Sequence, residues 1–322
     1  MPTRAQKRIV TEPPCPRKRR RGIWLAVGAS LALLSVTAFL YGRQAISMLT
    51  HRKGAPTQTE LVTPFPTGAR PTLRIAVAGD VGEAEEEVWQ TAYAMHMLEG
   101  GNPRYDVLLL LGDNVYPSGD PARLDATVFH PFGILLENGT RLLAILGNHD
   151  VAGGQGLEQI HALGMPGPWW ATTVEDVLLI GLDSNSLDDP DQLAFLEDTL
   201  RTADERWRIV AIHESPYSAG YQGSNITVRE TYAPLFARYG VQLVLSGHDH
   251  DYQRSLPIDG VTYMIAGAGG RTRGTGEEWF TAASWSVLSY VDLNVFPDRL
   301  LLRAIDQEGR MFDEVRIERT PG

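Results

Sequence analysis

Cysteine is almost absent from this chain of 322 residues, which contains only Cys15. Cys15 precedes the apolar segment 23–41, whereas the acylated cysteine of a lipoprotein follows such a segment, so it cannot be a lipid attachment site. The residues after it contain no thiol, and therefore no disulfide supports the folded part of the chain. Any metal site there has to use ligands other than thiolate.

Basic residues are scarce beyond the first 53 positions. Residues 1–53 hold eleven Lys and Arg and a single acid, Glu12, which leaves 18 basic and 38 acidic residues in the rest of the chain. Nucleic acid needs a basic face, so we expect no nucleic-acid binding by this acidic part. Internal repeats and low-complexity tracts are also lacking, and the length allows one large domain with accessory segments.

The N-terminal residues account for the basic excess. Residues 1–22 form a basic tail whose cluster Arg17–Arg21 is followed by 23–41, nineteen residues without a charge. As a helix, this segment would span roughly 28 Å, close to the ~30 Å hydrocarbon core of a bilayer. We therefore predict a transmembrane signal-anchor helix at 23–41. The larger positive cluster stays inside, so the tail is expected in the cytoplasm and the catalytic part outside, in a periplasmic or extracellular location.

A cleaved signal peptide is the alternative, with Val36–Ala38 as a small-residue cleavage site and a secreted product. The 22-residue leader is long for a signal peptide, which favours the uncleaved anchor. Downstream, residues 42–71 are polar and contain several Pro and Thr, which predicts a flexible linker. The folded domain is then expected at 72–322.

Strand and helix patterns alternate through the first part of this domain. Helices are predicted at 83–98, 192–201 and 229–239, and a hairpin is predicted from strands 169–173 and 177–182. From Val261 onward the pattern becomes all strand. Alternating strands and helices followed by consecutive strands predict the α/β class, with two sheets in layers.

Five apolar runs of the domain end in residues of the kind that bind metals. The run at 108–116 reads LLLLGDNVY and leaves Asp113 at the exit of a buried strand, where an unpaired carboxylate would be costly without a cation. The five runs end in GD at 79–80, GDNVY at 112–116, GNHD at 147–150, His213, and GHDH at 247–250. Open α/β sheets bind ligands at the carboxyl ends of their strands, so these residues are expected to form one metal site.

Each of these residues also has an ordinary explanation when it is taken alone. Asp80 could cap a helix, Asn148 could sit in a turn, His213 could be a hydrogen-bonded core histidine, and Tyr116 could pack. Together, those explanations would require seven coincidences at five strand ends, which favours the metal site. A mixture of carboxylate, amide, imidazole and phenol suits iron, manganese or zinc better than calcium.

These motifs resemble the metallophosphoesterase (calcineurin-like) superfamily, and specifically its purple acid phosphatase, or tartrate-resistant acid phosphatase-like, branch. Most members carry a histidine where this chain has Gly82, and the purple acid phosphatase branch instead has a tyrosine at the position of Tyr116. The resemblance covers residues 72–270. It implies the metallophosphoesterase fold, a four-layer α/β/β/α sandwich of two mixed sheets, here behind one transmembrane helix and without a plant-type N-terminal β-sandwich.

The resemblance also implies two metal ions. The ligands of the first ion, Fe(III) in the family, would be Asp80, Asp113, Tyr116 and His250. The ligands of the second ion, Fe(II), Zn or Mn, would be Asn148, His213, His248 and the bridging Asp113.

The implied activity is that of an acid phosphatase, which hydrolyses small-molecule phosphomonoesters by in-line attack of a metal-bound hydroxide. His149 would be the catalytic residue, donating a proton to the leaving alkoxide or stabilising the phosphoryl charge. Asp150 would orient that imidazole or cap a helix. Mammalian-type members have a further histidine beyond the position of His213, and residues 214–222 contain none. That difference concerns leaving-group specificity and pH optimum, not the metal site.

Two other functions share these motifs. A phosphodiesterase or nucleotide hydrolase of the same superfamily is one, because the motifs determine the chemistry and not the shape of the substrate site. A catalytically silent, membrane-anchored binding protein is the other, although no ligand is lost and His149 is present. Arg271 and Arg273 would bind a substrate anion or simply be exposed to solvent.

The charge asymmetry around 23–41 generates a prediction about topology. Protease added to intact cells is expected to cleave the linker at 54–71, because the tail with the larger positive cluster remains in the cytoplasm. Immunoblotting of the released domain measures this cleavage. Full protection of the linker, with cleavage only after lysis, would reverse the orientation.

Overall fold

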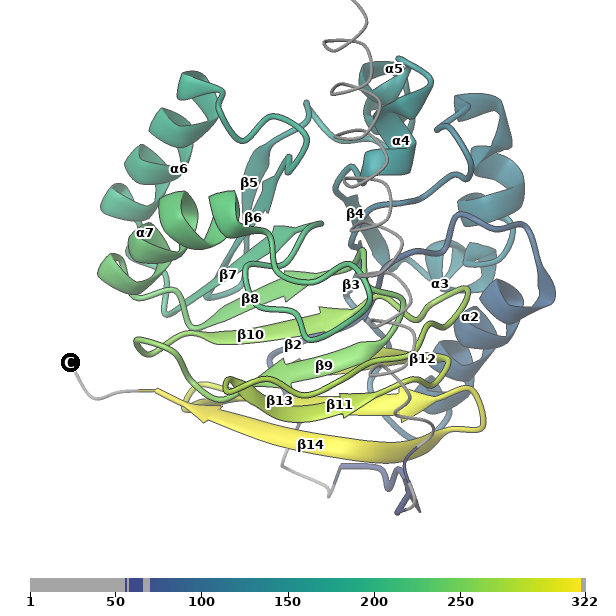
Figure 1. Cartoon of the computed structure of the whole chain (residues 1–322). Coiled ribbons are helices and arrows are strands. Elements are labelled where there is room, and N and C mark those ends of the chain that lie inside the picture. The colour runs from purple at the N-terminus through teal and green to yellow at the C-terminus, as the bar shows by residue number, and fades with distance from the viewer. Residues whose placement is uncertain (1–55, 57, 66–69, 320–322) are drawn as a thin grey trace, which may run out of the picture. The chain divides into compact units, whose positions relative to one another are not determined.

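The structure, a computed structural model, describes residues 56, 58–65 and 70–319. These residues form two seven-stranded sheets with helices on the outer side of each, as Figure 1 shows. The predicted α/β fold with two mixed sheets is therefore confirmed. Within the described ranges, no helix is long and apolar enough to cross a membrane. The predicted tail at 1–22 and anchor helix at 23–41 lie outside the described residues.

The first sheet joins the start of the domain to its end. Its strand order is β1 (Glu60–Leu61), β14 (Arg310–Glu318), β13 (Arg299–Asp306), β12 (Ser289–Val295), β2 (Leu73–Ala78), β3 (Val107–Leu110) and β4 (Arg141–Ala144). Strands β2, β3 and β4 are parallel, and the other pairs are antiparallel. Every residue of β2 and β3 is buried, which explains their unbroken apolar runs.

The second sheet contains the remaining strands. Their order is β11 (Thr281–Trp285), β9 (Tyr252–Ser255), β10 (Thr262–Ala266), β8 (Leu243–Ser246), β7 (Trp207–Ile212), β6 (Val177–Leu182) and β5 (Trp170–Val174). Strands β6, β7, β8 and β10 run parallel to their neighbours in that group. Strands β5 and β6 form the predicted antiparallel hairpin.

Alternate residues of the second sheet face two different hydrophobic cores. Leu179, Ile209 and Leu245 belong to the core shared with the first sheet. Ile180, Val210 and Val244 belong to the core beneath the outer helices. This alternation follows from the period of two along a strand, and it separates the layers.

The helices cover the outer faces of the sheets (Figure 1). Helices α2 (Glu86–Glu99) and α3 (Gly133–Glu137) lie on the side of the first sheet, and α6 (Pro190–Thr202) and α7 (Ala233–Arg238) on the side of the second. The remaining short elements are η1 (Pro121–Arg123), η2 (Asp125–Phe129), α4 (Asn148–Ala152), α5 (Gly156–Ala162) and η3 (Val228–Tyr232). The three predicted helices thus correspond to α2, to α6, and to η3 with α7.

Part of the predicted linker lies against the domain. Strand β1 pairs with β14 through Glu60 opposite Met311 and Leu61 opposite Arg310. Further along, the backbone N–H of Phe65 donates to Asn102 Oδ1 at 3.2 Å. The folded part of the chain therefore begins before Thr72, because a polar segment can still add a strand to an open sheet edge. The complete four-part division of the chain stays a prediction.

Backbone hydrogen bonds join the two sheets at the carboxyl ends of their parallel strands. Gly79 N–H, after β2, donates to Ala266 O at the end of β10 at 2.7 Å. Gly269 N–H returns a bond to Gly79 O at 3.2 Å. The loop that follows β2 in one sheet consequently meets the loop that follows β10 in the other, and His213, after β7, contacts Leu111 O, after β3, at 2.7 Å.

A buried ion network underlies β2, β12 and β13, and the apolar patterns gave no sign of it. Asp292 Oδ1 accepts from Arg74 Nε at 2.9 Å, and Asp292 Oδ2 accepts from Arg303 Nε at 2.8 Å. All three side chains are buried. Two guanidinium groups thus share one carboxylate inside the protein.

Substitution of that shared carboxylate is expected to be strongly destabilising. Asp292→Ala leaves two buried positive charges without their acid and should lower the free energy of unfolding by about 3–5 kcal/mol, measured by chemical denaturation. Asp298→Ala is the matched control, because Asp298 is an exposed partner of Arg299 on the adjoining turn and should cost less than about 1 kcal/mol. Equal costs for the two variants would contradict this account of the network.

Candidate metal centre

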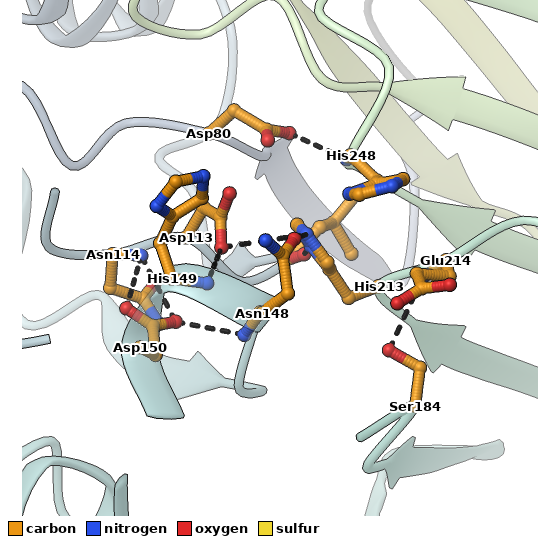
Figure 2. Close-up of polar contacts among 12 residues, drawn as sticks. Asp80, Asp113, Asn114, Asn148, His149, Asp150, Ser184, His213, Glu214 and His248 are labelled. Atoms are coloured by element: carbon orange, nitrogen blue, oxygen red, sulfur yellow. Dashed lines mark hydrogen bonds and ion pairs between the residues drawn. The ribbon is translucent and has the colours of Figure 1, made fainter. Parts of the chain in front are cut away.

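The seven predicted metal ligands come together at the joined strand ends. Each follows the carboxyl end of a parallel strand, in a loop or, for Asn148, at the first residue of α4. Figure 2 shows Asp80, Asp113, Asn148, His213 and His248 side by side. All seven are buried or half-buried: Asp80, Asp113, Tyr116, Asn148, His213, His248 and His250. The loops therefore bring together residues that are up to 170 positions apart in the chain.

One group of ligand atoms surrounds Asp80. The hydroxyl of Tyr116 lies 3.2 Å from Asp80 Oδ1 and 3.2 Å from His250 Nε2. His250 Nε2 is 3.4 Å from Asp80 Oδ1. One ligand atom each from Asp80, Asp113 and His250 lies within 4.8 Å of the others, a spacing that could hold a metal ion.

A second group of ligand atoms surrounds His213. Its Nε2 lies 3.2 Å from Asn148 Oδ1 and 3.5 Å from Asp113 Oδ1. Its Nδ1 lies 2.7 Å from Leu111 O, so Nδ1–H donates to that carbonyl and Nε2 keeps its lone pair for the site. The ring of His248 lies 5.1 Å from that of His213, centroid to centroid. Asp113 contacts residues of both groups, as a bridging ligand must.

Two glycines pack directly against the predicted ligands, so that a larger residue at either position would collide with them. A Cβ on Gly147 would collide with the Asp113 carboxylate, and a Cβ on Gly247 would lie 2.6 Å from Asp80 Oδ2. Asp80, Asp113 and His248 themselves have positive φ angles, of 59°, 52° and 68°. Left-handed backbone at three non-glycine residues costs free energy, and such strain is concentrated at functional sites. The residues present fit a metal centre.

Burial and mutual charge also prepare the site for cations. Burial raises the pKa of Tyr116, and the Asp80 and Asp113 carboxylates raise it further, so a cation is needed to produce the phenolate. Burial lowers the pKa of His248 to about 3, with the charge of His213 adding to the effect. His248 therefore remains a neutral imidazole, which is the form that binds metals.

Gly82 has no space for the histidine that most superfamily members carry at this position. A Cβ on Gly82 would lie 2.6 Å from Val115 N and 2.7 Å from Asp113 O. The tight approach follows from backbone bonds, because Gly82 N–H donates to Asp113 O and Tyr116 N–H donates to Gly82 O. The same bonds position Tyr116, whose hydroxyl reaches Asp80 and His250. In this chain, therefore, the absence of a side chain at Gly82 and the placement of Tyr116 in the site depend on the same backbone hydrogen bonds.

His149 stands beside the centre with its ring held in one orientation. Its Nδ1 lies 2.8 Å from Pro117 O, so Nδ1–H donates to the carbonyl and Nε2 is left for other contacts. Its ring packs edge-on against that of Tyr116 at 4.7 Å. Its backbone N–H donates to Asp113 Oδ1 at 2.9 Å, which couples the turn at 147–150 to the bridging carboxylate.

Asp150 organises the loops and does not orient His149. Its carboxylate accepts from the backbone N–H of Gly147 at 2.8 Å, at the start of α4, and from those of Asn114 and Val115 at 2.9 and 3.0 Å. Of its two predicted roles, the helix cap is therefore correct, and the imidazole instead contacts a carbonyl. Burial, and after it the Asp113 charge, raises the pKa of Asp150 to about 6.

Sequence reasoning missed the residues that hold the ligand loops in place. Asn114 is fully buried and donates to Ile145 O at 2.9 Å, and Asp249 accepts from Gln222 N–H at 2.7 Å. Asp251 accepts from Gln253 Nε2 at 2.9 Å. Only their position in the sequence could have indicated these residues, because Asn114, Asp249 and Asp251 are each the immediate neighbour of a predicted ligand.

The chain belongs to the calcineurin-like phosphoesterase family. Residues 73–252, more than half of the chain, match this family. The match extends from the first residue of β2 to the first residue of β9 and therefore contains all five strand ends of the centre. The superfamily assignment made from the motifs is confirmed.

Within this family the chain is homologous to the tartrate-resistant acid phosphatases. It is 27% identical to type 5 of the rabbit Oryctolagus cuniculus over 250 residues, which cover 66% of this chain and 77% of that protein. It is 27% identical to human type 5 over 251 residues, with the same shares covered. The resemblance to the purple acid phosphatase branch is therefore also confirmed.

Solved structures of the same fold include an acid phosphatase and a protein described as an anchor. Purple acid phosphatase PPD1 of yellow lupin gives a TM-score of 0.64 at 18% identity, covering 83% of this chain and 55% of that chain. GAP50, described as the anchor in the inner membrane complex of Plasmodium, gives 0.69 at 17% identity, covering 78% and 90%. At these identities the likeness shows the fold alone.

The position of Asp113 between the two ligand groups generates a prediction. Asp113→Asn keeps the shape of the side chain but removes its charge, so the purified protein should lose at least one metal ion per chain, measured by elemental analysis. His149→Ala is the control and should keep its metal content, because His149 contacts Asp113 through the backbone N–H. Unchanged metal content in Asp113→Asn would remove Asp113 from the bridging role.

Proposed function

We propose that this protein is a dinuclear metal-dependent phosphohydrolase of the purple acid phosphatase type, which hydrolyses phosphomonoesters. The observation that carries the proposal is the placement of Asp113 Oδ1 within reach of His213, beside a second group formed by Asp80, Tyr116 and His250. Two groups of ligands that share one carboxylate are what a dinuclear site requires. The similarity to tartrate-resistant acid phosphatases supports the choice of monoesters.

The two groups differ in the chemistry of their donors. Phenolate and two carboxylates suit a hard trivalent ion such as Fe(III), whereas amide and imidazole donors suit Fe(II), Zn or Mn. Bound ions would supply Lewis acidity toward the phosphate oxygens and would lower the pKa of a bound water. The role of the protein is to hold Asp80, Tyr116 and His250 around one ion and Asn148, His213 and His248 around the other, with Asp113 common to both.

His149 is the residue suited to protonate the leaving group or to stabilise the charge of the phosphoryl group. The Pro117 carbonyl holds the Nδ1–H, so protonation of the ring adds its proton at Nε2, the atom that remains for a substrate. A proton held at Nε2 can pass to the leaving alkoxide oxygen or stabilise the negative charge of the phosphoryl group. His149 lies in the first turn of α4, directly after Asn148, so it is positioned beside the second group of ligands.

We place the catalytic domain outside the cytoplasm, held by the N-terminal helix at 23–41. The support is the uncharged run of nineteen residues and the basic cluster before it. Secretion after signal cleavage is the alternative, and the domain would then be found in the medium before protease is added. A catalytically silent binding protein on the same scaffold is the rival function. GAP50, which shares the fold, is described as a membrane-complex anchor, so the fold is compatible with such a role.

Substrate turnover tests the proposed function. The purified protein should hydrolyse 4-nitrophenyl phosphate faster than bis(4-nitrophenyl) phosphate, because a monoester dianion suits two cations better than a diester monoanion. His149→Ala should lose about 10²-fold or more in kcat while keeping its metals. Faster turnover of the diester would support the alternative function, that of a phosphodiesterase. No turnover of either substrate by metal-loaded protein would support the binding protein.

A further inference from the structure

Two arginines follow β10 at the edge of the candidate centre, and their surroundings differ. Arg271 Nη1 forms an ion pair with Glu83 Oε1 at 2.7 Å, and its guanidinium carbon lies 5.4 Å from the ring centre of Tyr116. The charge of Arg271 is therefore neutralised within the protein.

Within the described part of the chain, Arg273 has no such acid. Among residues 56, 58–65 and 70–319, no carboxylate forms an ion pair with it and no group accepts a hydrogen bond from its side chain. Its guanidinium carbon lies 5.5 Å from the ring centre of Tyr221, and the residue is half-buried. Among those residues the N–H donors of its guanidinium thus have no protein acceptor, although the domain has about twice as many acidic as basic residues.

The backbone fixes Arg273 beside the predicted ligands. Arg273 N–H donates to His250 O at 2.7 Å. Arg273 is therefore adjacent to the metal centre and not on a remote surface.

The loop that carries Tyr221 is tied to the loop that carries Arg273. Gly276 N–H donates to Ala219 O at 3.0 Å, and Gly220 pairs with Thr275 in an isolated bridge. Beneath them, Ser218 donates to the buried Asp249 carboxylate. The aromatic ring and the guanidinium are thus held together by bonds that do not involve their own side chains.

We propose that Arg273, supported by Tyr221, binds a second anionic group on the alcohol part of the substrate. The inference rests on the proposed phosphomonoesterase function and specifies its substrate class: esters whose alcohol part carries a carboxylate or a further phosphate. In the proposed function, the bound cations and His149 contact the phosphate that reacts. A guanidinium at the edge of the site offers paired N–H donors to a separate carboxylate or phosphate.

Two substrates that differ by one carboxylate test the proposal. The ratio of kcat/KM for 4-carboxyphenyl phosphate to that for phenyl phosphate should exceed one in the unmodified protein. Arg273→Gln should lower this ratio about tenfold or more, as expected for loss of a charge-assisted hydrogen bond. Arg273→Lys should lower it less, because the charge remains. Arg271→Gln is the matched control, and the ratio should not change because Arg271 is paired with Glu83.

Failure of this inference can be distinguished from failure of the proposed function. An unchanged ratio in Arg273→Gln, or equal losses on both substrates, would overturn the assignment to a second anion. If metal-loaded protein hydrolyses neither substrate, the phosphomonoesterase proposal fails, and calorimetric titration then decides the binding question. In that titration, 4-carboxyphenylphosphonate should bind more tightly than phenylphosphonate, and Arg273→Gln should remove the difference. Equal affinities in the unmodified protein would overturn the inference.

Discussion

The concentration of negative charge at Asp80 and Asp113 is the constraint on which the site depends. Both carboxylates are buried, and within the described part of the chain the cationic groups that form ion pairs with them are imidazoles, not Lys or Arg. Buried acids in this setting require cations. The left-handed backbone at both aspartates, the close approach of Gly147 and Gly247, and the bonds between the two sheets all keep these carboxylates close together.

The branch-specific features of the centre follow from backbone geometry. Because Gly82 packs on the backbone of Asp113 and Val115, the loop after β2 cannot present a histidine, and the hydroxyl of Tyr116 fills that part of the site. The loop after β4 is joined to the loop after β3 through the Asp150 carboxylate. A change in any one loop would therefore displace ligands that belong to another.

The sequence predicted the features that depend on periodicity and strand ends. These include the buried parallel strands, the β5–β6 hairpin and the seven residues that meet at the centre. It did not predict β9 (Tyr252–Ser255), where three of the four residues are polar and three are buried, or α4, whose first residue is itself a predicted ligand. It also missed the Asp292 network and the bonds that Asp150 accepts from Asn114 and Val115. The Asp292 network and these Asp150 bonds join residues that are distant in the chain, and local sequence patterns cannot reveal such contacts.

The central claim is that the joined strand ends hold two cations bridged by Asp113. Anomalous X-ray diffraction from crystals of the metal-loaded protein, recorded on both sides of the iron absorption edge, tests it most directly. The account predicts two peaks about 3.5–4 Å apart, one on either side of the Asp113 carboxylate. The peak next to Tyr116 should be stronger above the iron absorption edge than below it, as expected for bound iron. A single peak, or two peaks that Asp113 does not join, would contradict the account.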